Sequence, residues 1–149
     1  MDDNTCFTGS SSGSVSIINI NEGKIIKKIE EHCLPVRSIT LNRTNNHLFS
    51  ASDDLHINQI DIVTNKVIIP LVGHKDKINK LLYNETKELL FSASSDGSIK
   101  IWDPKAKFKL IESLNPNDKN SSNIYDIAIN KEGNFMTYTS DDGIGAFVS

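Results

Sequence analysis

Phe91-Ser-Ala-Ser-Ser-Asp-Gly-Ser-Ile-Lys-Ile-Trp-Asp103 decides the fold, because related stretches recur in this chain at nearly constant spacing. Phe49-Ser-Ala-Ser-Asp-Asp-Leu-His-Ile-Asn-Gln-Ile-Asp61 lies 42 residues earlier. A third version begins at Phe7, another 42 residues back, and a fourth begins at Thr137, 46 residues forward of Phe91. Four copies at one period indicate tandem repeats, in which each unit is one small supersecondary structure.

A second marker keeps the same register. Gly73-His74 stands 42 residues after Glu31-His32, and a β-branched residue follows each histidine four positions later. A period of about 40 to 45 residues, with Gly-His early and Trp-Asp late, is typical of a four-stranded propeller blade. Apolar and polar residues alternate between the markers, which favours strands over helices.

The repeat pattern predicts fourteen strands. The first unit begins at a strand over residues 6–10, and the last unit ends with a strand over 144–148. We therefore predict an all-β fold, a partial β-propeller of about three and a half four-stranded antiparallel blades in one domain, residues 1–149. The expected blades cover residues 5–30 (incomplete), 31–72, 73–114 and 123–149 (incomplete).

The turn between the second and third strands of a blade needs a backbone that glycine provides most easily. Gly97 and Gly143 stand at this turn in two blades, whereas Leu55 replaces the glycine in the second blade. We expect the turn at Leu55 to take another shape or to carry strain, and its blade to be less regular. The strands of the two middle blades are expected at 36–41, 47–52, 56–61 and 66–71, and at 78–83, 89–94, 99–102 and 107–114.

Three residues of the third unit, His74, Ser92 and Asp96, are the residue types of a hydrolytic triad, and a hydrolase is one interpretation. The other interpretation is structural: the imidazole bonds the carboxylate and the hydroxyl, which in turn accepts the indole N–H of Trp102. A partial copy of the set in the second unit favours a relay repeated in each blade. The residues assigned to this relay are His32, Ser50, Asp54, His74, Ser92, Asp96 and Trp102.

Composition and charge exclude several classes of function. Of the 149 residues, 38% are apolar and 23% are charged, with a net charge of −3. Acidic and basic residues are interspersed, so we expect no broad basic face for nucleic acid. No stretch approaches the roughly 18 apolar residues of a membrane span, and no zinc motif or phosphate-binding glycine loop occurs. We expect a non-catalytic protein of the cytoplasm or nucleus, with no metal, no cofactor, no direct nucleic-acid contact and no membrane contact.

The repeated Ser-Ala-Ser motif, with Gly73-His74 and Trp102-Asp103, resembles the WD-repeat β-propellers over residues 6–148. This resemblance implies a scaffold that holds other proteins together.

A narrower resemblance covers residues 23–29, 31–40 and 50–54, and most of it rests on the stretch from His32 to Ser38, His-Cys-Leu-Pro-Val-Arg-Ser. This stretch is similar to the later blades of the WD-repeat subunit of the superkiller complex. The resemblance implies docking on a tetratricopeptide-repeat partner, in a cytoplasmic assembly that passes messenger RNA to the exosome. It also implies a nuclear role beside RNA polymerase II, in the polymerase-associated factor complex. A generic adaptor, such as a substrate receptor of a ubiquitin ligase, is the alternative within the same class.

Resemblance to WD-repeat propellers also points to one rim of the blades as the binding surface. This rim contains residues at the start of each first strand and the residue before the turn aspartate. Arg37 and Tyr125 are the strongest candidates, because these residue types concentrate binding energy when they are desolvated. The rim candidates are Pro35, Arg37, Asp53, Lys77, Asn79, Ser95, Asn123, Tyr125 and Asp141.

The expected number of blades leaves the ring open. Propellers close with about four to eight blades, so three and a half blades expose unpaired strand edges. The interpretation that we favour is a portion of a longer propeller. Self-association of two copies through the open edges is the alternative.

Overall fold

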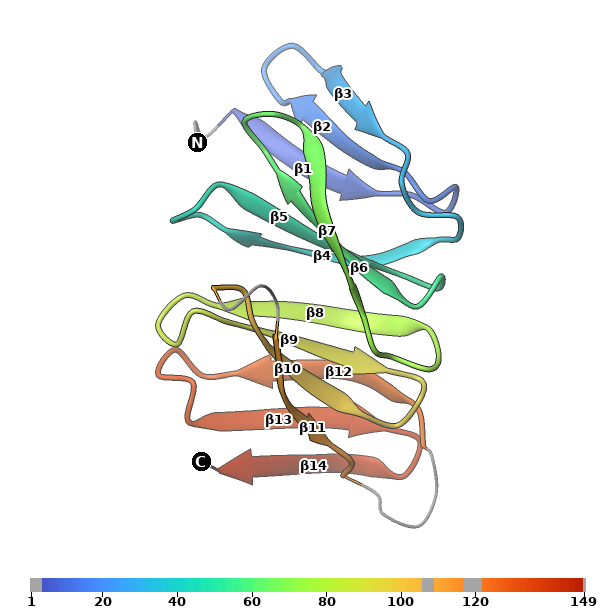
Figure 1. Ribbon diagram of the computed structural model, residues 1–149, viewed down its shortest axis with the longest axis vertical. Coiled ribbons are helices and arrows are strands. Elements are labelled where there is room, and N and C mark those ends of the chain that lie inside the picture. Colours follow the sequence, from blue (N-terminus) through green and yellow to red (C-terminus); the bar gives the residue numbers. More distant parts are fainter. Residues whose placement is uncertain (1–3, 106–108, 117–121, 149) are drawn as a thin grey trace.

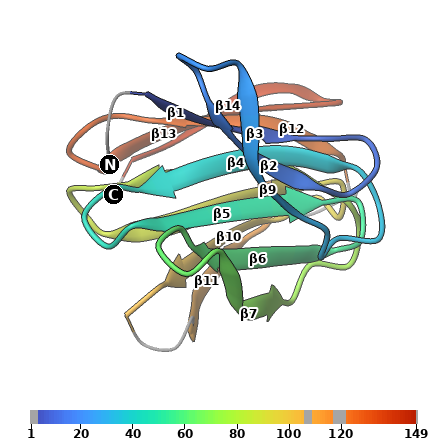
Figure 2. The same cartoon turned by 90° about the horizontal axis from the view of Figure 1, so that it is seen from above.

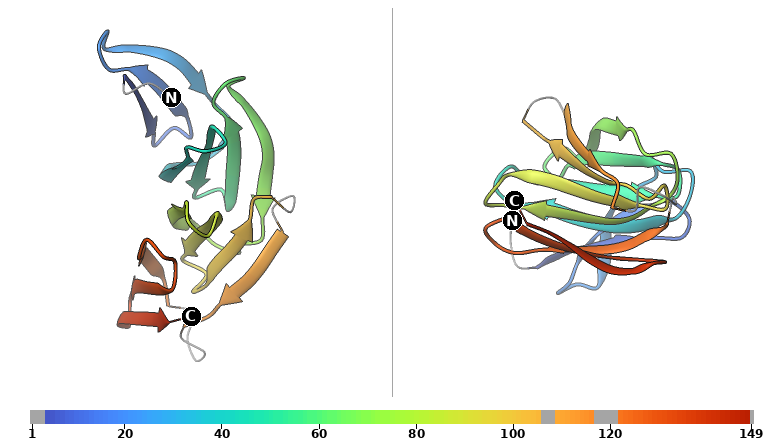
Figure 3. Two further views of the ribbon diagram at one scale, coloured as in Figure 1. Left: turned by 90° about the vertical axis from the view of Figure 1, so that its left-hand side faces the viewer. Right: turned by 90° about the horizontal axis from the view of Figure 1, so that it is seen from below.

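The computed structural model describes residues 4–105, 109–116 and 122–148, and their regular structure consists of strands. Four antiparallel sheets follow one another along the chain (Figure 1), which confirms the predicted all-β class. Successive sheets fan out, so that the stack forms an open arc (Figure 3). The described residues contain no helix that could span a membrane.

The strands are numbered in chain order, and each sheet is built from consecutive strands. The first sheet contains β1 (Thr5–Gly9), β2 (Val15–Asn19) and β3 (Lys24–Ile29). The second contains β4 (Val36–Asn42), β5 (His47–Ser52), β6 (His56–Asp61) and β7 (Lys66–Val72). The third contains β8 (Ile78–Asn84), β9 (Leu89–Ser94), β10 (Ile99–Asp103) and β11 (Lys109–Leu114). The fourth contains β12 (Ile124–Ile129), β13 (Phe135–Ser140) and β14 (Gly143–Val148).

The observed strands lie where the sequence places them. Each described strand of the two middle sheets begins and ends within two residues of its predicted bounds. The first two residues of the strand predicted over 107–114 lie outside the described residues. The last strands of the two complete sheets, β7 and β11, lie on the same side of the stack (Figure 2).

The core consists of three apolar clusters, one between each pair of neighbouring sheets. Because side chains alternate across a strand, adjacent residues of one strand serve different clusters. On β5, Leu48 packs toward the first sheet and Phe49 toward the third. On β9, Leu90 packs toward the second sheet and Phe91 toward the fourth. The middle sheets are therefore covered on both faces, which explains why adjacent residues at these positions are both apolar.

The turn at Leu55 corrects one expectation. Leu55 has positive φ, as Gly97 has at the equivalent turn of the third sheet. The Leu55 N–H donates to the Ser52 carbonyl at 3.3 Å, and the Gly97 N–H donates to the Ser94 carbonyl at 3.2 Å. The expectation of another shape was therefore wrong, because the leucine adopts the backbone that glycine adopts. The second sheet is also no less regular, since both middle sheets carry two register shifts.

The first and fourth sheets contain three described strands each, so β14 has no described neighbour on its outer side. A groove of about 440 Å³ lies between the third and fourth sheets. It is lined mainly by apolar side chains, among them Ile111, Phe135 and Phe147.

Candidate functional site

A chain of hydrogen bonds joins His74, Asp96, Ser92 and Trp102 in the third sheet. His74 lies between β7 and β8, Asp96 in the β9–β10 turn, and the other two residues on β9 and β10. His74 Nδ1 is 2.8 Å from Asp96 Oδ2, and His74 Nε2 is 2.7 Å from Ser92 Oγ. The indole N–H of Trp102 donates to Ser92 Oγ at 2.9 Å. The structure thus brings the four predicted residues into one hydrogen-bonded network.

The donors and acceptors available fix the direction of each bond. The ionised Asp96 carboxylate can only accept, so the proton of the neutral imidazole lies on His74 Nδ1 and is donated to Asp96. His74 Nε2 then accepts the Ser92 proton, and Ser92 Oγ accepts the indole N–H of Trp102. Each polar group in the network is therefore satisfied by the next.

The surroundings of this relay keep the histidine neutral and the aspartate ionised. Burial lowers the pKa of His74, and the hydrogen bond to Asp96 offsets that effect only in part. Burial alone would raise the pKa of Asp96. Hydrogen bonds from His74 and Ser98 outweigh burial and hold that pKa well below its usual range.

A shorter relay lies in the second sheet. His32 Nδ1 is 2.8 Å from Asp54 Oδ2, and His32 Nε2 is 2.9 Å from Ser50 Oγ. Ile60 occupies the strand position of Trp102 and is buried among apolar side chains facing the first sheet. Apolar packing therefore takes the place of the third hydrogen bond, the one that the Trp102 indole donates in the third sheet. The stabilising role of the two relays remains a prediction.

A reduced version of the relay in the fourth sheet was not predicted from the sequence. Ser122 lies just before β12, where a histidine precedes β4 and β8, and its hydroxyl donates to the Asp142 carboxylate. Ser122 is buried, and Asp142 occupies the turn position of Asp96. The only sequence signal is the pair Asp142-Gly143, because no histidine marks the residue that contacts the turn.

The triad-like geometry of the third sheet is closed to a substrate. A nucleophilic serine must reach a substrate carbonyl, and hydrogen-bond donors must stand ready for the developing oxyanion. Ser92 has 0% of its surface exposed, and its Oγ already accepts the indole proton of Trp102. A substrate could reach this hydroxyl only if the second and third sheets separated. What the network can do as it stands is fasten the loop before β8 to the sheet.

The predicted rim residues gather where β4, β8 and β12 begin. In each of these strands the pairing with the next strand skips the second residue. The skipped residues are Arg37, Asn79 and Tyr125. A β-bulge of this kind re-aims the side chain of the extra residue, so the backbone sets the direction of these three side chains.

Two of the bulge residues bond the acid that precedes the turn aspartate. Arg37 donates to both oxygens of Asp53, at 2.8 Å from Nε and 2.6 Å from Nη2. The Tyr125 hydroxyl donates to Asp141. Each bond lowers the pKa of the acid that accepts it. The Arg37 side chain is 50% exposed and Tyr125 is 51% exposed, so both donors face solvent.

The third bulge residue joins two sheets. Asn79 Nδ2 donates to Ser95 Oγ at 3.0 Å and to the Ile124 carbonyl of the fourth sheet at 2.7 Å. Asn79 is half-buried, which distinguishes it from the other two bulge residues.

The remaining rim candidates contribute backbone bonds to the same clusters. The carbonyls of Pro35, Lys77 and Asn123 accept the N–H of the residue before each turn aspartate, at 3.0, 2.9 and 3.2 Å. The structure therefore gathers the nine predicted residues into three clusters, one in each of the second, third and fourth sheets. We call these the rim clusters: Pro35, Arg37 and Asp53; Lys77, Asn79 and Ser95; Asn123, Tyr125 and Asp141.

A family model matches two stretches of this chain. The model for the WD domain, G-beta repeat (WD40), matches residues 23–61 and 65–103. Each matched stretch contains the last strand of one sheet and the first three strands of the next. No curated protein matches the chain.

Proposed function

Since this chain belongs to the WD40 family of WD domains with G-beta repeats, we propose that it is a non-catalytic scaffold that binds other proteins through its rim clusters. WD40 repeats generally serve as protein-interaction scaffolds. We assign the binding to the rim because three sheets present the same arrangement of bulge residue and partner side chain there.

The single observation that carries this proposal is that the two exposed rim side chains, Arg37 and Tyr125, are each held in place by an aspartate before any partner binds. Arg37 is fixed by two bonds to Asp53, and Tyr125 by its bond to Asp141. Arginine and tyrosine are enriched among residues that dominate binding energy. Side chains that are ordered before binding lose less conformational entropy when a partner docks, which favours affinity.

The non-catalytic part of the proposal is supported by the relay. The serine hydroxyls in the two triad-like positions, Ser92 and Ser50, are both buried, because the same arrangement recurs without the tryptophan in the second sheet. A repeated, buried network suits the stability of each sheet and does not suit a single active site.

We further propose that the partner is a tetratricopeptide-repeat protein. The assembly would be the superkiller complex, which passes messenger RNA to the exosome in the cytoplasm, or the polymerase-associated factor complex in the nucleus. Support comes from the resemblance of residues 32–38 to the superkiller WD-repeat subunit, because this stretch contains Arg37 of the first rim cluster. A ubiquitin-ligase receptor would use the same rim with a different partner.

Binding to purified partners tests both the rim as the binding surface and the identity of the partner. The wild-type chain should bind the tetratricopeptide subunit of the superkiller complex, and the double variant Arg37→Ala, Tyr125→Ala should bind at least tenfold more weakly. Lys66→Ala is the matched control, because Lys66 is exposed at the start of β7, away from the rim, and should leave binding unchanged. Thermal unfolding should be nearly the same in all three proteins, since exposed ion pairs add little stability.

Other outcomes separate the alternatives. Binding to cullin-ligase components in place of the tetratricopeptide protein would support the ligase adaptor and contradict the superkiller assignment. Binding that survives the double variant would show that the rim is the wrong surface. Esterase or peptidase activity lost in Ser92→Ala without loss of stability would overturn the non-catalytic assignment.

A further inference from the structure

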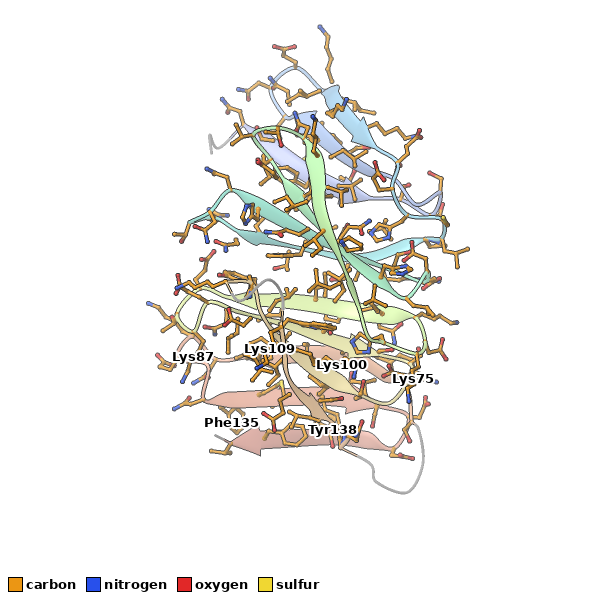
Figure 4. All side chains as sticks on the ribbon, in the orientation of Figure 1. Lys75, Lys87, Lys100, Lys109, Phe135 and Tyr138 are labelled. Atoms are coloured by element: carbon orange, nitrogen blue, oxygen red, sulfur yellow. The ribbon has the colours of Figure 1, made fainter. Side chains whose placement is uncertain are left out.

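A second candidate binding surface is the groove between the third and fourth sheets. It has a volume of about 440 Å³, and it lies at the other end of the strands from the rim clusters, because its lining includes Ile129 at the end of β12. Two lining residues, Lys87 and Phe135, lie at the opposite end of the sheets from Lys75 (Figure 4). Pockets that bind ligands occupy about 300–1,000 Å³, so the groove has room for a large side chain of a partner.

The corresponding place between the second and third sheets is filled. The ring of Tyr83 stacks on Phe49 there, with centroids 5.8 Å apart. Trp102 belongs to the same apolar cluster, and Ile69 packs against it. Phe49 is 0% exposed and Trp102 is 3% exposed, so these side chains close the boundary between the two sheets.

Smaller or charged side chains take three of these places between the third and fourth sheets. By strand pairing, the replacements are Ile129 for Tyr83, Phe147 for Trp102 and Glu112 for Ile69. Phe91 stands at the position of Phe49, but Ile129 offers it no ring to stack on. Phe91 and the three replacements all line the groove. The groove therefore lies where larger apolar side chains lie at the preceding boundary.

The lining of the groove is mainly apolar and is open to solvent. Ile111 is 52% exposed, Phe135 is 43% exposed and Val148 is 79% exposed. Apolar side chains that gather around a surface groove mark a site of interaction. The two charged lining residues, Lys87 and Glu112, have opposite signs, so the groove does not favour an ion over a neutral group.

We propose that this groove binds an aromatic side chain of a partner protein. The ring stacks on Phe91, as the ring of Tyr83 stacks on Phe49, and packs against Ile129 and Met136. The occupant is aromatic because aromatic rings complete the same kind of boundary one repeat earlier. Stacked rings also attract one another beyond the area that they bury. That the ring belongs to a protein rests on the proposed function.

Neutral tripeptides test the groove without a known partner. The methyl signals of Ile129 and Met136 are followed by NMR while Gly-Phe-Gly, Gly-Leu-Gly or Gly-Gly-Gly is added to the full chain. Gly-Phe-Gly should shift both signals saturably through its ring current, and it should bind about threefold or more tightly than Gly-Leu-Gly. Gly-Gly-Gly should shift neither signal. Equal binding of the first two peptides, or no shift with any peptide, would overturn the proposal.

A variant that fills the groove tests the assignment directly. Ile129→Tyr places on β12 the ring that Tyr83 places on β8, so Gly-Phe-Gly should no longer shift the Met136 methyl signal. The variant should unfold at the same or a higher temperature than the wild type, because its ring buries apolar surface in the groove. Saturating Gly-Phe-Gly should raise the unfolding temperature of the wild type alone. Unchanged binding in folded Ile129→Tyr would overturn the proposal.

A second pair of variants keeps the test independent of the folding of Ile129→Tyr. Ile111→Ser shortens an exposed side chain of the lining and should weaken the binding of Gly-Phe-Gly about threefold. Ile68→Ser is the matched control, because Ile68 is the corresponding bulge residue of β7, is equally exposed and lies outside the groove. Equal effects of the two variants on binding would overturn the proposal.

A second copy of this chain is the competing occupant of the groove. Light scattering should give the same molar mass for the wild type and for Ile129→Tyr. A wild-type dimer that Ile129→Tyr converts into a monomer would assign the groove to a second copy and would overturn its assignment to a partner.

The two proposals fail in distinguishable ways. If Gly-Phe-Gly does not bind but the Arg37→Ala, Tyr125→Ala variant loses its partner, only the groove assignment is wrong. If Gly-Phe-Gly binds in the groove while no protein partner depends on the rim, the rim assignment is wrong and the aromatic site stands.

Discussion

Leu55 and Gly97 hold the same left-handed backbone conformation at equivalent turns of neighbouring sheets, with φ of 73° and 80°. Glycine adopts this region freely, whereas a residue with a Cβ is strained there by about 1–2 kcal/mol. We therefore expect Leu55→Gly to raise the free energy of unfolding by about 1 kcal/mol, as measured by urea denaturation. The gain is smaller than the strain because glycine also gives the unfolded chain more freedom.

The reciprocal change is the control. Gly97→Leu introduces the same strain into the third sheet and should lower the free energy of unfolding by about 1–2 kcal/mol. If Leu55→Gly destabilises the protein instead, contacts of the half-buried leucine outweigh its backbone strain.

Removing the serine should lower the free energy of unfolding by different amounts in the two relays. Ser92→Ala leaves both the Trp102 indole N–H and His74 Nε2 buried without a partner, whereas Ser50→Ala leaves only His32 Nε2. Each buried unsatisfied group costs about 1–3 kcal/mol. We expect a loss of about 3 kcal/mol for Ser92→Ala and about 1.5 kcal/mol for Ser50→Ala in urea denaturation. Equal losses would contradict the contribution of the tryptophan.

Stability should depend on pH through His74. Its pKa is lowered in the folded protein, so between that pKa and the ordinary value of about 6.5 the unfolded chain binds more protons than the folded one. The contribution of His74 to the free energy of unfolding is therefore complete above about pH 6.5, and the free energy of unfolding falls as the pH drops below that value. Below about pH 4 a second loss begins, because the lowered pKa of Asp96 has the same consequence.

Two histidine variants separate this effect from general acid sensitivity. His74→Gln should lower stability at pH 7.5 but flatten the dependence between pH 7 and 5, measured by urea denaturation across that range. His56→Gln, which removes a histidine whose side chain is 44% exposed, is the control for the loss of an imidazole outside the relay of the third sheet. An unchanged slope in His74→Gln would mean that another group controls it.

The strands were predictable because their signals are local and repeated. Leu48 and Phe49 are both apolar since sheets cover both faces of β5, and the turns fall at Asp-rich or Asn-rich stretches. The relay was predictable because its members keep their spacing from one repeat to the next. Where the spacing changed, before β12, the buried Ser122 was missed, because no residue type marks it.

Other features depend on three-dimensional relationships that residue types do not carry. The bulges that aim Arg37 and Tyr125 arise from the pairing of two strands, and no single residue encodes them.

Tyr83 should resist ionisation and link the second sheet to the third. Its hydroxyl accepts from Asn42 Nδ2 at 2.9 Å across the boundary, and its ring stacks on Phe49 with centroids 5.8 Å apart. Burial and nearby acids raise the pKa of Tyr83 to about 12. The unfolded tyrosine loses its proton near pH 10. The contribution of Tyr83 to stability is therefore complete below about pH 10, and stability falls as the pH rises toward the pKa that Tyr83 has in the folded protein.

A spectroscopic titration with Tyr83→Phe tests this link. The absorbance of tyrosinate should show Tyr83 ionising near pH 12 in the wild type, and the ionisation near pH 12 should be absent from the variant, which retains Tyr125, whose pKa is also raised, by its bond to Asp141. Tyr83→Phe also leaves the Asn42 amide without its acceptor, so we expect it to lower the free energy of unfolding by about 1–2 kcal/mol at pH 7. Tyr138→Phe is the matched control and should keep the late ionisation. If the late ionisation survives in Tyr83→Phe, the hydroxyl is not the buried group that joins the two sheets.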